Sequence, residues 1–193
     1  MPGAEIKVWD RFVRLFHWGM VALVAGAFLT QDAKGPHIAV GYAVLALLGA
    51  RLIWGFVGTR YARFHDFVVG PRAVAGYLRT LRAGHPRRYL GHNPAGGAMV
   101  LALLALLLAT AGTGWLSRTD RFFGDDLVSG LHSALSSVLI GAIVLHVLGV
   151  VVSSVLHREN LVRAMLTGRK PAELAGELQD EGGPAAGARL YPR

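Results

Sequence analysis

The sequence predicts an all-α protein, an integral membrane four-helix bundle. Its 193 residues are 53% hydrophobic, with a mean hydropathy of +0.43, which is too apolar for an ordinary soluble domain and too short for several domains. Apolar runs of spanning length, or nearly so, cover about residues 13–30, 38–57, 95–116 and 131–156. The last run carries no formal charge and, at about 1.5 Å per residue, is longer than a hydrocarbon core of about 30 Å. We expect one multi-pass membrane domain over residues 1–170.

The distribution of charge predicts an orientation. The formal net charge is +8. Its cations gather before or within the first span, between the second and third spans, and after the fourth span (Lys7, Arg11, Arg14; Arg60, Arg63, Arg72, Arg79, Arg82, Arg87, Arg88; Arg158, Arg163, Arg169, Lys170). Because cationic loops stay in the cytoplasm, we expect both termini and residues 58–94 to be cytoplasmic, with the protein in the bacterial inner membrane. The basic excess then reflects topology and attraction to the lipid bilayer, and we expect no nucleic acid as a partner.

The first span should remain in the protein as a helix. It ends in Thr30, Gln31 and Asp32, without the small-x-small pattern at which signal peptides are cleaved. The next residues, up to Gly35 and Pro36, contain helix breakers and predict a short loop with an antiparallel return. The second span should then begin near Ile38.

The remaining segments predict one further helix and a tail. From Pro71 onward, apolar residues recur at helical spacing with arginines on the other side, which predicts an amphipathic helix in the cytoplasmic interface between the second and third spans. The third span, with Gly112 and Gly114 near its end, reads as a packing helix. Residues 171–193 are rich in Ala, Gly, Pro and charge and predict a disordered cytoplasmic tail.

Four histidines fall into two pairs at two depths of this bundle. His132 and His146 are fourteen residues apart, which places them on one helix face about 21 Å apart along the axis. His17 lies near the inner end of the first span, level with His146. His37 lies near the outer end of the second span, level with His132. An ionisable side chain within a span is costly and usually marks a function.

Haem b suits these pairs better than a bare metal ion. The chain has no cysteine, so thiolate-bound zinc, iron–sulfur clusters and covalently attached haem are excluded. Each level offers two imidazoles, whereas zinc or copper needs three or four protein ligands, and a porphyrin supplies four nitrogens itself. Two haem b groups with both axial positions filled would carry out one-electron transfer.

Other polar side chains of the sequence have more than one possible role. Arg51 lies fourteen residues after His37 on the same helix face, where it could bind a haem propionate or a quinone-site group, or equally extend to the headgroups. His92 reads as a loop or capping residue, with a role at a cofactor edge as the alternative. His65 and His85 read as solvated.

The histidine pattern resembles that of a known family. The matching stretches are FHW at 16–18, HIAVGYAVLALLGARLIWGF at 37–56, GHNPAGG at 91–97 and LHSALSSVLIGAIVLHVLGVVVSSVLHREN at 131–160. Over about residues 6–170 the chain resembles bacterial four-helix, di-haem cytochromes b561, of the same broad family as the cytochrome b subunits of nickel-iron hydrogenases. The resemblance implies haem b ligation by His17, His37, His132 and His146, and quinone-linked electron transfer. Ser153 and Ser154 stand where some members carry further histidines, so functions peculiar to those members, such as direct superoxide oxidation, are not implied.

These observations predict a membrane electron carrier. It would pass electrons between the quinone pool and a partner redox protein (a cytochrome c, a hydrogenase or a molybdoenzyme) or a small oxidant. Whether the chain is itself an enzyme, with quinone oxidoreductase activity, stays open at this point. Two alternatives use the same residues differently: a histidine-relay metal or proton transporter, and a passive membrane anchor for a dehydrogenase. The lack of Asp and Glu within the spans counts against the transporter.

Overall fold

Four long helices dominate the structure, a computed structural model that describes residues 5–84 and 87–171. They are α1 (Arg11–Leu29), α2 (Lys34–Val57), α5 (Pro94–Leu116) and α6 (Asp126–Leu156). Each is long and apolar enough to cross a membrane, from 19 residues in α1 to 31 in α6. The predicted all-α membrane bundle is confirmed.

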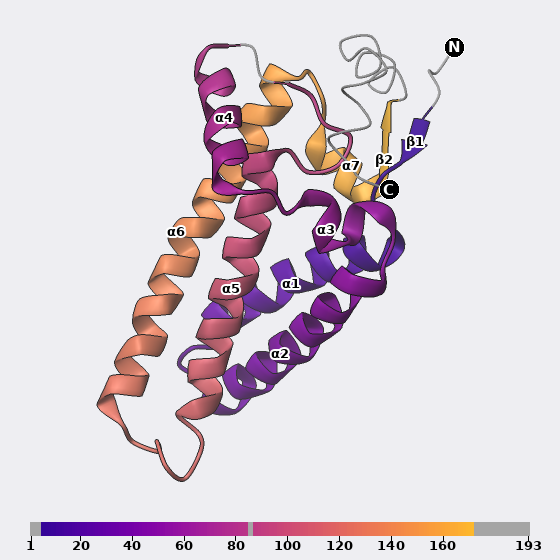
Figure 1. Ribbon diagram of the computed structural model, residues 1–193. Helices are drawn as coiled ribbons and strands as arrows, with labels where there is room; N and C mark the ends of the chain where they lie inside the picture. Colours follow the sequence, from indigo (N-terminus) through magenta and orange to yellow (C-terminus); the bar gives the residue numbers. More distant parts are fainter. Residues whose placement is uncertain (1–4, 85–86, 172–193) are drawn as a thin grey trace. The chain divides into compact units, whose positions relative to one another are not determined.

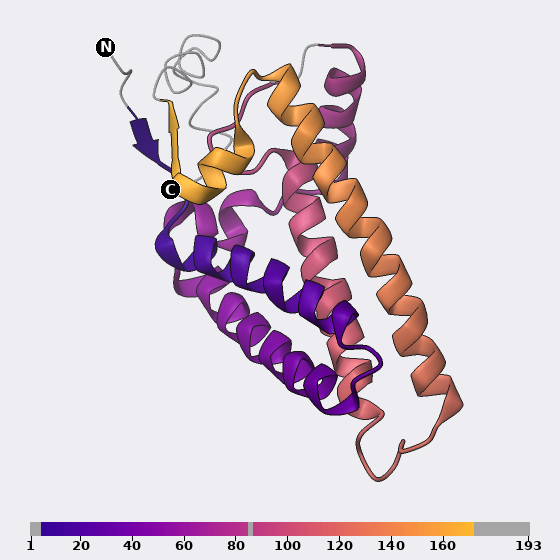
Figure 2. The same cartoon turned by 180° about the vertical axis from the view of Figure 1, so that it is seen from behind.

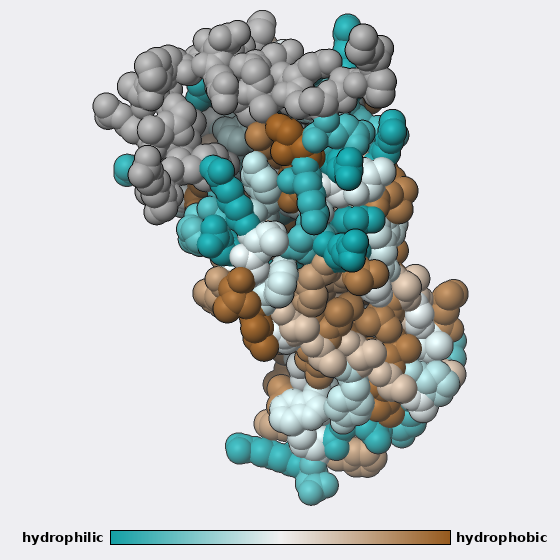
Figure 3. Space-filling view, turned by 90° about the vertical axis from the view of Figure 1, so that its right-hand side faces the viewer, coloured by the Kyte–Doolittle hydropathy of each residue, from teal (hydrophilic) through white to brown (hydrophobic). Residues whose placement is uncertain are grey.

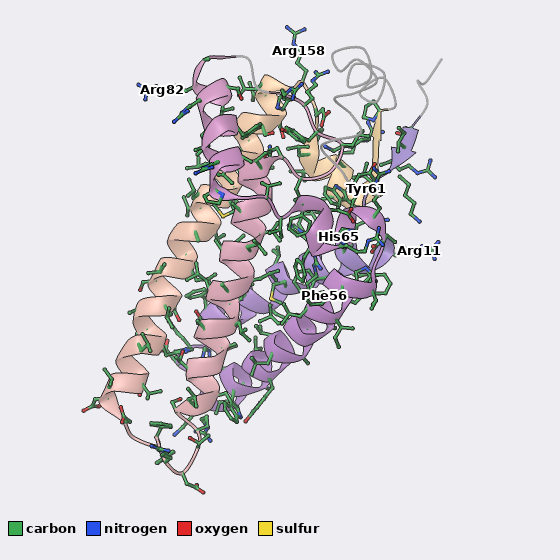
Figure 4. All side chains as sticks on the ribbon, in the orientation of Figure 1. Arg11, Phe56, Tyr61, His65, Arg82 and Arg158 are labelled. Carbon is green, nitrogen blue, oxygen red and sulfur yellow. The ribbon has the colours of Figure 1, made fainter. Side chains whose placement is uncertain are left out.

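Shorter elements connect the long helices. They are β1 (Glu5–Lys7), η1 (Arg60–Ala62), α3 (Phe64–Phe67), α4 (Pro71–Arg82), α7 (Leu161–Thr167) and β2 (Arg169–Pro171). The predicted amphipathic helix is α4, whose last residue, Arg82, points away from the helix (Figure 4). Its position in the membrane interface stays a prediction. The predicted tail lies, apart from Pro171, outside the described residues.

All four long helices begin before the predicted spans, α2 and α6 by the widest margin. Gly35 and Pro36 do not act as helix breakers, because both lie within the first turn of α2, which begins at Lys34. A proline is tolerated in the first helical turn, where its missing N–H has no helical acceptor to lose. The turn is therefore formed before it, where the Ala33 amide donates to the Thr30 carbonyl at 2.8 Å. Helix α6 begins at Asp126, and the Asp125 carboxylate caps it by accepting from the Val128 amide at 3.0 Å.

The chain divides into two compact units, and each long helix contributes to both. We call Leu15–Trp54 with Met99–Gly149 the bundle unit. We call Met1–Arg14, Gly55–Ala98 and Val150–Arg193 the loop unit, of which residues 1–4, 85–86 and 172–193 are not described. The two units are treated separately below.

The bundle unit packs its helices over a thin core. Within it α1 lies beside α2, and α5 lies beside α6 (Figure 1 and Figure 2). Its buried apolar side chains come from all four helices (Met20, Val44, Leu48, Leu104, Leu107, Leu139). In the most apolar stretch of each span at most 22% of residues are buried, and apolar side chains cover the helix face seen in Figure 3. Such exposed apolar surface is what a lipid-solvated bundle presents.

The loop unit joins the two ends of the described chain. Strand β1 pairs antiparallel with β2, so that Ile6 lies opposite Lys170. The amides of Val8 and Trp9 both donate to the Gly168 carbonyl, at 2.9 and 3.1 Å. Gly168 ends α7 with a positive φ of 80°, and a methyl group on it would lie 2.6 Å from the Trp9 carbonyl oxygen. Only glycine fits there without strain.

Candidate functional site

The structure brings His37 of α2 together with His132 of α6. Their ring centroids are 6.2 Å apart and their planes are perpendicular, at 90°. Two imidazoles that bind one metal ion through nitrogens at about 2 Å have ring centres about 6 Å apart. The spacing of the His37–His132 pair therefore suits one shared metal.

The second predicted pair is also formed in the bundle unit. The ring centroids of His17 on α1 and His146 on α6 are 6.4 Å apart, with an angle of 55° between the planes. Along α6, His132 and His146 are separated by fourteen residues, or about 21 Å of helix. The bundle thus holds two histidine pairs at two levels, as the sequence predicted.

Backbone carbonyls orient both rings of the His37–His132 pair. Nδ1 of His37 lies 2.9 Å from the Ala27 carbonyl oxygen, and Nδ1 of His132 lies 2.9 Å from the Thr110 carbonyl oxygen. A carbonyl oxygen can only accept, so each Nδ1 carries the hydrogen and donates it. Each Nε2 is then left with a free lone pair, which is the tautomer that binds a metal.

The surroundings of the His17–His146 pair differ from those of the His37–His132 pair. Nδ1 of His17 is buried and has no hydrogen-bond partner among residues 5–84 and 87–171. The His17 ring also meets the edge of Trp18, with centroids 4.9 Å apart. A buried imidazole without a protein partner on this nitrogen fits a role as a ligand to something the polypeptide does not itself supply.

Arg51 lies beside the residue that precedes His17. Its guanidinium carbon is 5.9 Å from the centroid of the Phe16 ring, and only 3% of its surface is exposed. A side chain this buried is enclosed by the protein, which argues against the alternative that it extends to the lipid headgroups. The structure favours the assignment of Arg51 to the binding of an anion inside the bundle.

A small cavity adjoins the His37–His132 pair. It has a volume of about 60 Å³ and is lined, besides the two rings, by residues of α2, α5 and the turn that follows α5 (Ile38, Gly41, Tyr42, Leu45, Ala111, Gly114, Trp115, Arg118). A methyl group on Gly41 would meet no atom within 4 Å, whereas one on Gly114 would lie 3.0 Å from Cε1 of His132. A porphyrin is larger than this cavity and would displace side chains at its rim. The donor atoms, their spacing and their tautomers fit haem iron.

Arg118 is a site residue that the sequence analysis missed. Its sequence position, just after an apolar span and next to Asp120 and Arg121, is typical of a loop cation, but it lines the same cavity as His37 and His132. Its guanidinium suits a carboxylate, such as a haem propionate. The signal that could have found it is its position three residues after Trp115, at the end of an apolar span.

Among residues 5–84 and 87–171, neither pair is joined by a third metal-binding side chain. In the part of the chain that the structure describes, no group of three or more His, Asp or Glu side chains could hold a metal ion. A haem iron needs only two protein ligands because the porphyrin supplies the other four. The geometry therefore favours haem over a bare ion at both pairs.

The remaining histidines belong to the loop unit. The ring of His92 lies between Trp9 and Phe67, with centroids 4.7 Å from each. The side chain of His65 is exposed, as expected. His85 lies outside the described residues.

This bundle, with facing histidines at two depths of its apolar helices, has the features of a multi-pass membrane protein that holds haem. The comparisons identify the family: the chain belongs to the prokaryotic cytochrome b561 family, whose model matches residues 8–168. It is thus a membrane haem b protein that takes part in electron transfer. It is similar to a probable Ni/Fe-hydrogenase B-type cytochrome subunit of Azotobacter vinelandii, with 25% identity over 211 aligned positions that cover 84% of this chain and 87% of the relative. The corresponding protein of Azotobacter chroococcum mcd 1 is 24% identical over the same shares. No solved structure matches.

Proposed function

We propose that this chain binds two haem b groups and passes electrons between them through the membrane. The His17–His146 pair would hold one haem and the His37–His132 pair the other. The observation that carries the proposal is the pair of ring spacings, 6.4 and 6.2 Å, each of which suits two axial imidazoles on one iron. Haem b, when bound, supplies reversible one-electron chemistry.

The protein side chains hold and tune these groups. Arg51 supplies a buried cation near the His17–His146 pair, and Arg118, an exposed residue that lines the cavity, supplies a cation at the His37–His132 pair. Each would bind a propionate, which orients the porphyrin and offsets its negative charge. If His17 with His146 and His37 with His132 hold the two haems, the histidines would leave no open position on the iron for a substrate, and the haems would supply one-electron transfer.

The electron donors and acceptors follow from the family and the charge pattern. We propose that quinone or quinol exchanges electrons at the cytoplasmic end of a domain spanning residues 1–170, with both termini in the cytoplasm and the chain in the bacterial inner membrane. The relatives are named as hydrogenase cytochrome subunits, which favours a hydrogenase as the partner redox protein. A cytochrome c or a molybdoenzyme is the alternative partner.

The test is the haem content of single histidine variants. Purified wild-type protein should hold two haems per chain with the sharp reduced spectrum of bis-histidine haem b. His17→Ala or His146→Ala should remove one haem, and His37→Ala or His132→Ala the other, so that each single variant retains about half the pigment. His65→Ala is the matched control, because this exposed histidine belongs to neither pair. Full haem content in all four paired variants would overturn the proposal.

A further inference from the structure

A second cavity lies in the loop unit, apart from the histidine pairs. It has a volume of about 220 Å³ and lies among α3, α4 and the segment that leads into α5. Much of its lining is aromatic: Phe67, Tyr77, Tyr89 and His92. Its polar lining includes Asp66 and Thr80. Concave, mostly apolar sites with a few polar groups are typical of small-ligand binding.

We propose that this cavity binds the ring of a quinone or quinol, and that Asp66 and His65 pass protons between that ring and water. This inference rests on the proposed function, because it names the place where the quinone-linked step occurs. The conversion balances as quinone plus two electrons and two protons giving quinol, and the reverse. The electrons are exchanged with the haem b of this protein, one at a time, and the protons with Asp66.

The aromatic walls are rigid enough to hold a flat ring. Phe67 and Tyr77 are buried, at 4% and 6% exposure. Tyr77 meets Tyr89 edge-on, with centroids 5.9 Å apart and an interplanar angle of 77°. Phe67 packs on His92 at 4.7 Å, and Trp9 packs on His92 at 4.7 Å as well. Such contacts fix the side chains, so that a planar ligand meets a preformed surface.

The two tyrosines can serve as hydrogen-bond donors. Burial raises the pKa of the Tyr77 hydroxyl, as does neighbouring Tyr89, with a smaller opposing effect from Asn93. Burial also raises the pKa of the Tyr89 hydroxyl, partly offset by Arg87. Both phenols therefore keep their protons at neutral pH. The carbonyl oxygens of a quinone are acceptors, for which a neutral phenol is a suitable partner.

A route for protons leads from the cavity to water. Asp66 lines the cavity, and its side chain is only 11% exposed. One carboxylate oxygen lies 3.4 Å from Nε2 of His65, whose side chain is 62% exposed, and the other lies 3.2 Å from Nε of Arg63. Helix α3 carries both Asp66 and His65, and His65 is labelled in Figure 4. A carboxylate that faces a cavity on one side and an exposed imidazole on the other can relay a proton between them.

The other titratable groups at the cavity do not form this route. Tyr77 and Tyr89 keep their protons because their pKa values are raised. His92 lies between Trp9 and Phe67 and lines the cavity wall. Asp66 is thus the carboxylate of the lining that contacts both the cavity and an exposed imidazole.

A variant that fills the cavity tests the binding site. Gly76 lines the cavity, and a methyl group on it would meet no atom within 4 Å, so the fold tolerates a side chain there. Gly76→Leu should therefore occupy the ring's place while improving the helix propensity of α4. Ala75→Leu is the matched control, because Ala75 is exposed on the same helix and does not line the cavity.

The measurement uses full-length, haem-loaded protein in lipid nanodiscs with decylubiquinone as the probe, after subtraction of its partition into protein-free nanodiscs. We expect Gly76→Leu to weaken decylubiquinone binding at least tenfold and to raise the KM for decylubiquinol reduction of the haem. Ala75→Leu should behave like the wild type. Haem content and spectra should be unchanged in both variants, because neither residue belongs to a histidine pair.

Two further variants test the proton route. Asp66→Asn should leave decylubiquinone binding unchanged but slow haem reduction by decylubiquinol by roughly 100-fold, the typical effect of losing a positioned general base. His65→Gln should cause a smaller loss and shift the pH profile of the rate. A structural role of Asp66 alone would weaken binding or haem content instead.

The outcomes separate this inference from the proposed function. If Gly76→Leu and Ala75→Leu both bind and oxidise decylubiquinol like the wild type, the quinone site lies elsewhere and the inference is overturned, while the di-haem function stands. If Asp66→Asn turns over like the wild type, the proton route is overturned. If the wild type itself holds no haem, the proposed function fails first.

Discussion

Nδ1 of His132 lies 2.9 Å from the carbonyl oxygen of Thr110, so a histidine of α6 donates its hydrogen to the backbone of α5. His37 makes the same kind of bond to the Ala27 carbonyl, at 2.9 Å. Nδ1 of His17 has no such partner among the described residues. The two histidine pairs thus share their ring spacing but differ in what surrounds the rings.

This difference predicts unequal midpoint potentials for the two haems. A hydrogen bond from Nδ1 to a carbonyl makes the imidazole a stronger electron donor, which stabilises ferric iron and lowers the potential. His17→Ala should leave only the haem of the His37–His132 pair, and His132→Ala only that of the His17–His146 pair. Redox titration of the two single-haem variants should give the lower potential in His17→Ala.

Each variant must first show the low-spin spectrum of an intact bis-histidine haem, so that the titration reports on the remaining pair. Equal potentials, or a lower potential in His132→Ala, would mean that the carbonyl hydrogen bonds do not decide the order. The hydrogen bonds to the Ala27 and Thr110 carbonyls would then not set the direction of electron transfer between the two haems.

A second prediction concerns the close approach of α5 to His132. A methyl group on Gly114 would lie 3.0 Å from Cε1 and 3.2 Å from Nδ1 of His132. Gly114→Ala must therefore displace the His132 ring, which is positioned by the Thr110 carbonyl and faces His37. We expect this variant to lose up to half of the haem, all of it from the His37–His132 pair, as measured by pigment per chain.

Gly112→Ala is the control for Gly114→Ala. A methyl group on Gly112, two residues earlier in α5, would meet no atom within 4 Å. Its haem content should equal that of the wild type. If both variants bind two haems, the position of the His132 ring is not what holds the haem in place.

The sequence was sufficient for the long helices and for the histidine levels. Length and hydrophobicity set the spans, and the fourteen-residue spacing of His132 and His146 follows from helix geometry alone. The structure confirms the helices and brings the predicted pairs together. Haem ligation by these pairs stays a prediction.

Features that depend on contacts between distant residues could not be predicted. The pairing of Glu5–Lys7 with Arg169–Pro171 joins two short segments that carry no strand pattern. The sequence around Arg118 is that of a charged loop, and only the packing of α2 and α5 shows that Arg118 lines a cavity with His37. The start of α2 was misplaced because proline breaks helix interiors but not first turns.

Arg118 carries the third prediction. If its guanidinium binds a propionate of the haem at the His37–His132 pair, its removal should leave a carboxylate without a cation. We expect Arg118→Gln to lower the midpoint potential of that haem, because a nearby positive charge favours the reduced iron, and to make that haem easier to extract. Redox titration and haem retention on dilution in detergent measure the two effects.

Arg121→Gln is the matched control for charge. Arg121 lies three residues further on, exposed and 5.4 Å from the Phe122 ring centroid, and does not line the cavity. A general effect of lowering positive charge in this loop would change both variants alike. The propionate assignment requires that only Arg118→Gln changes the haem.

The last prediction concerns the effect of pH on the loop unit. Burial lowers the pKa of His157 below its usual value of 6.5, as do Arg88 and Lys170, while Glu159 has an opposing effect. Below pH 6.5 the unfolded chain therefore takes up a proton at this residue that the folded chain does not, so stability falls as the pH falls from 6.5 toward the folded pKa. Thermal unfolding should shift to lower temperature on acidification, and less so in His157→Asn.

The matched control is His65→Asn, since His65 is an exposed histidine of the same unit and does not contribute to the lowered pKa of His157. Its acid dependence should equal that of the wild type. An acid dependence in His157→Asn as steep as that of the wild type would assign the effect to another group. Thermal unfolding should be measured on the haem-loaded protein. Haem binding itself stabilises the folded state, so the haem content must be equal in all variants.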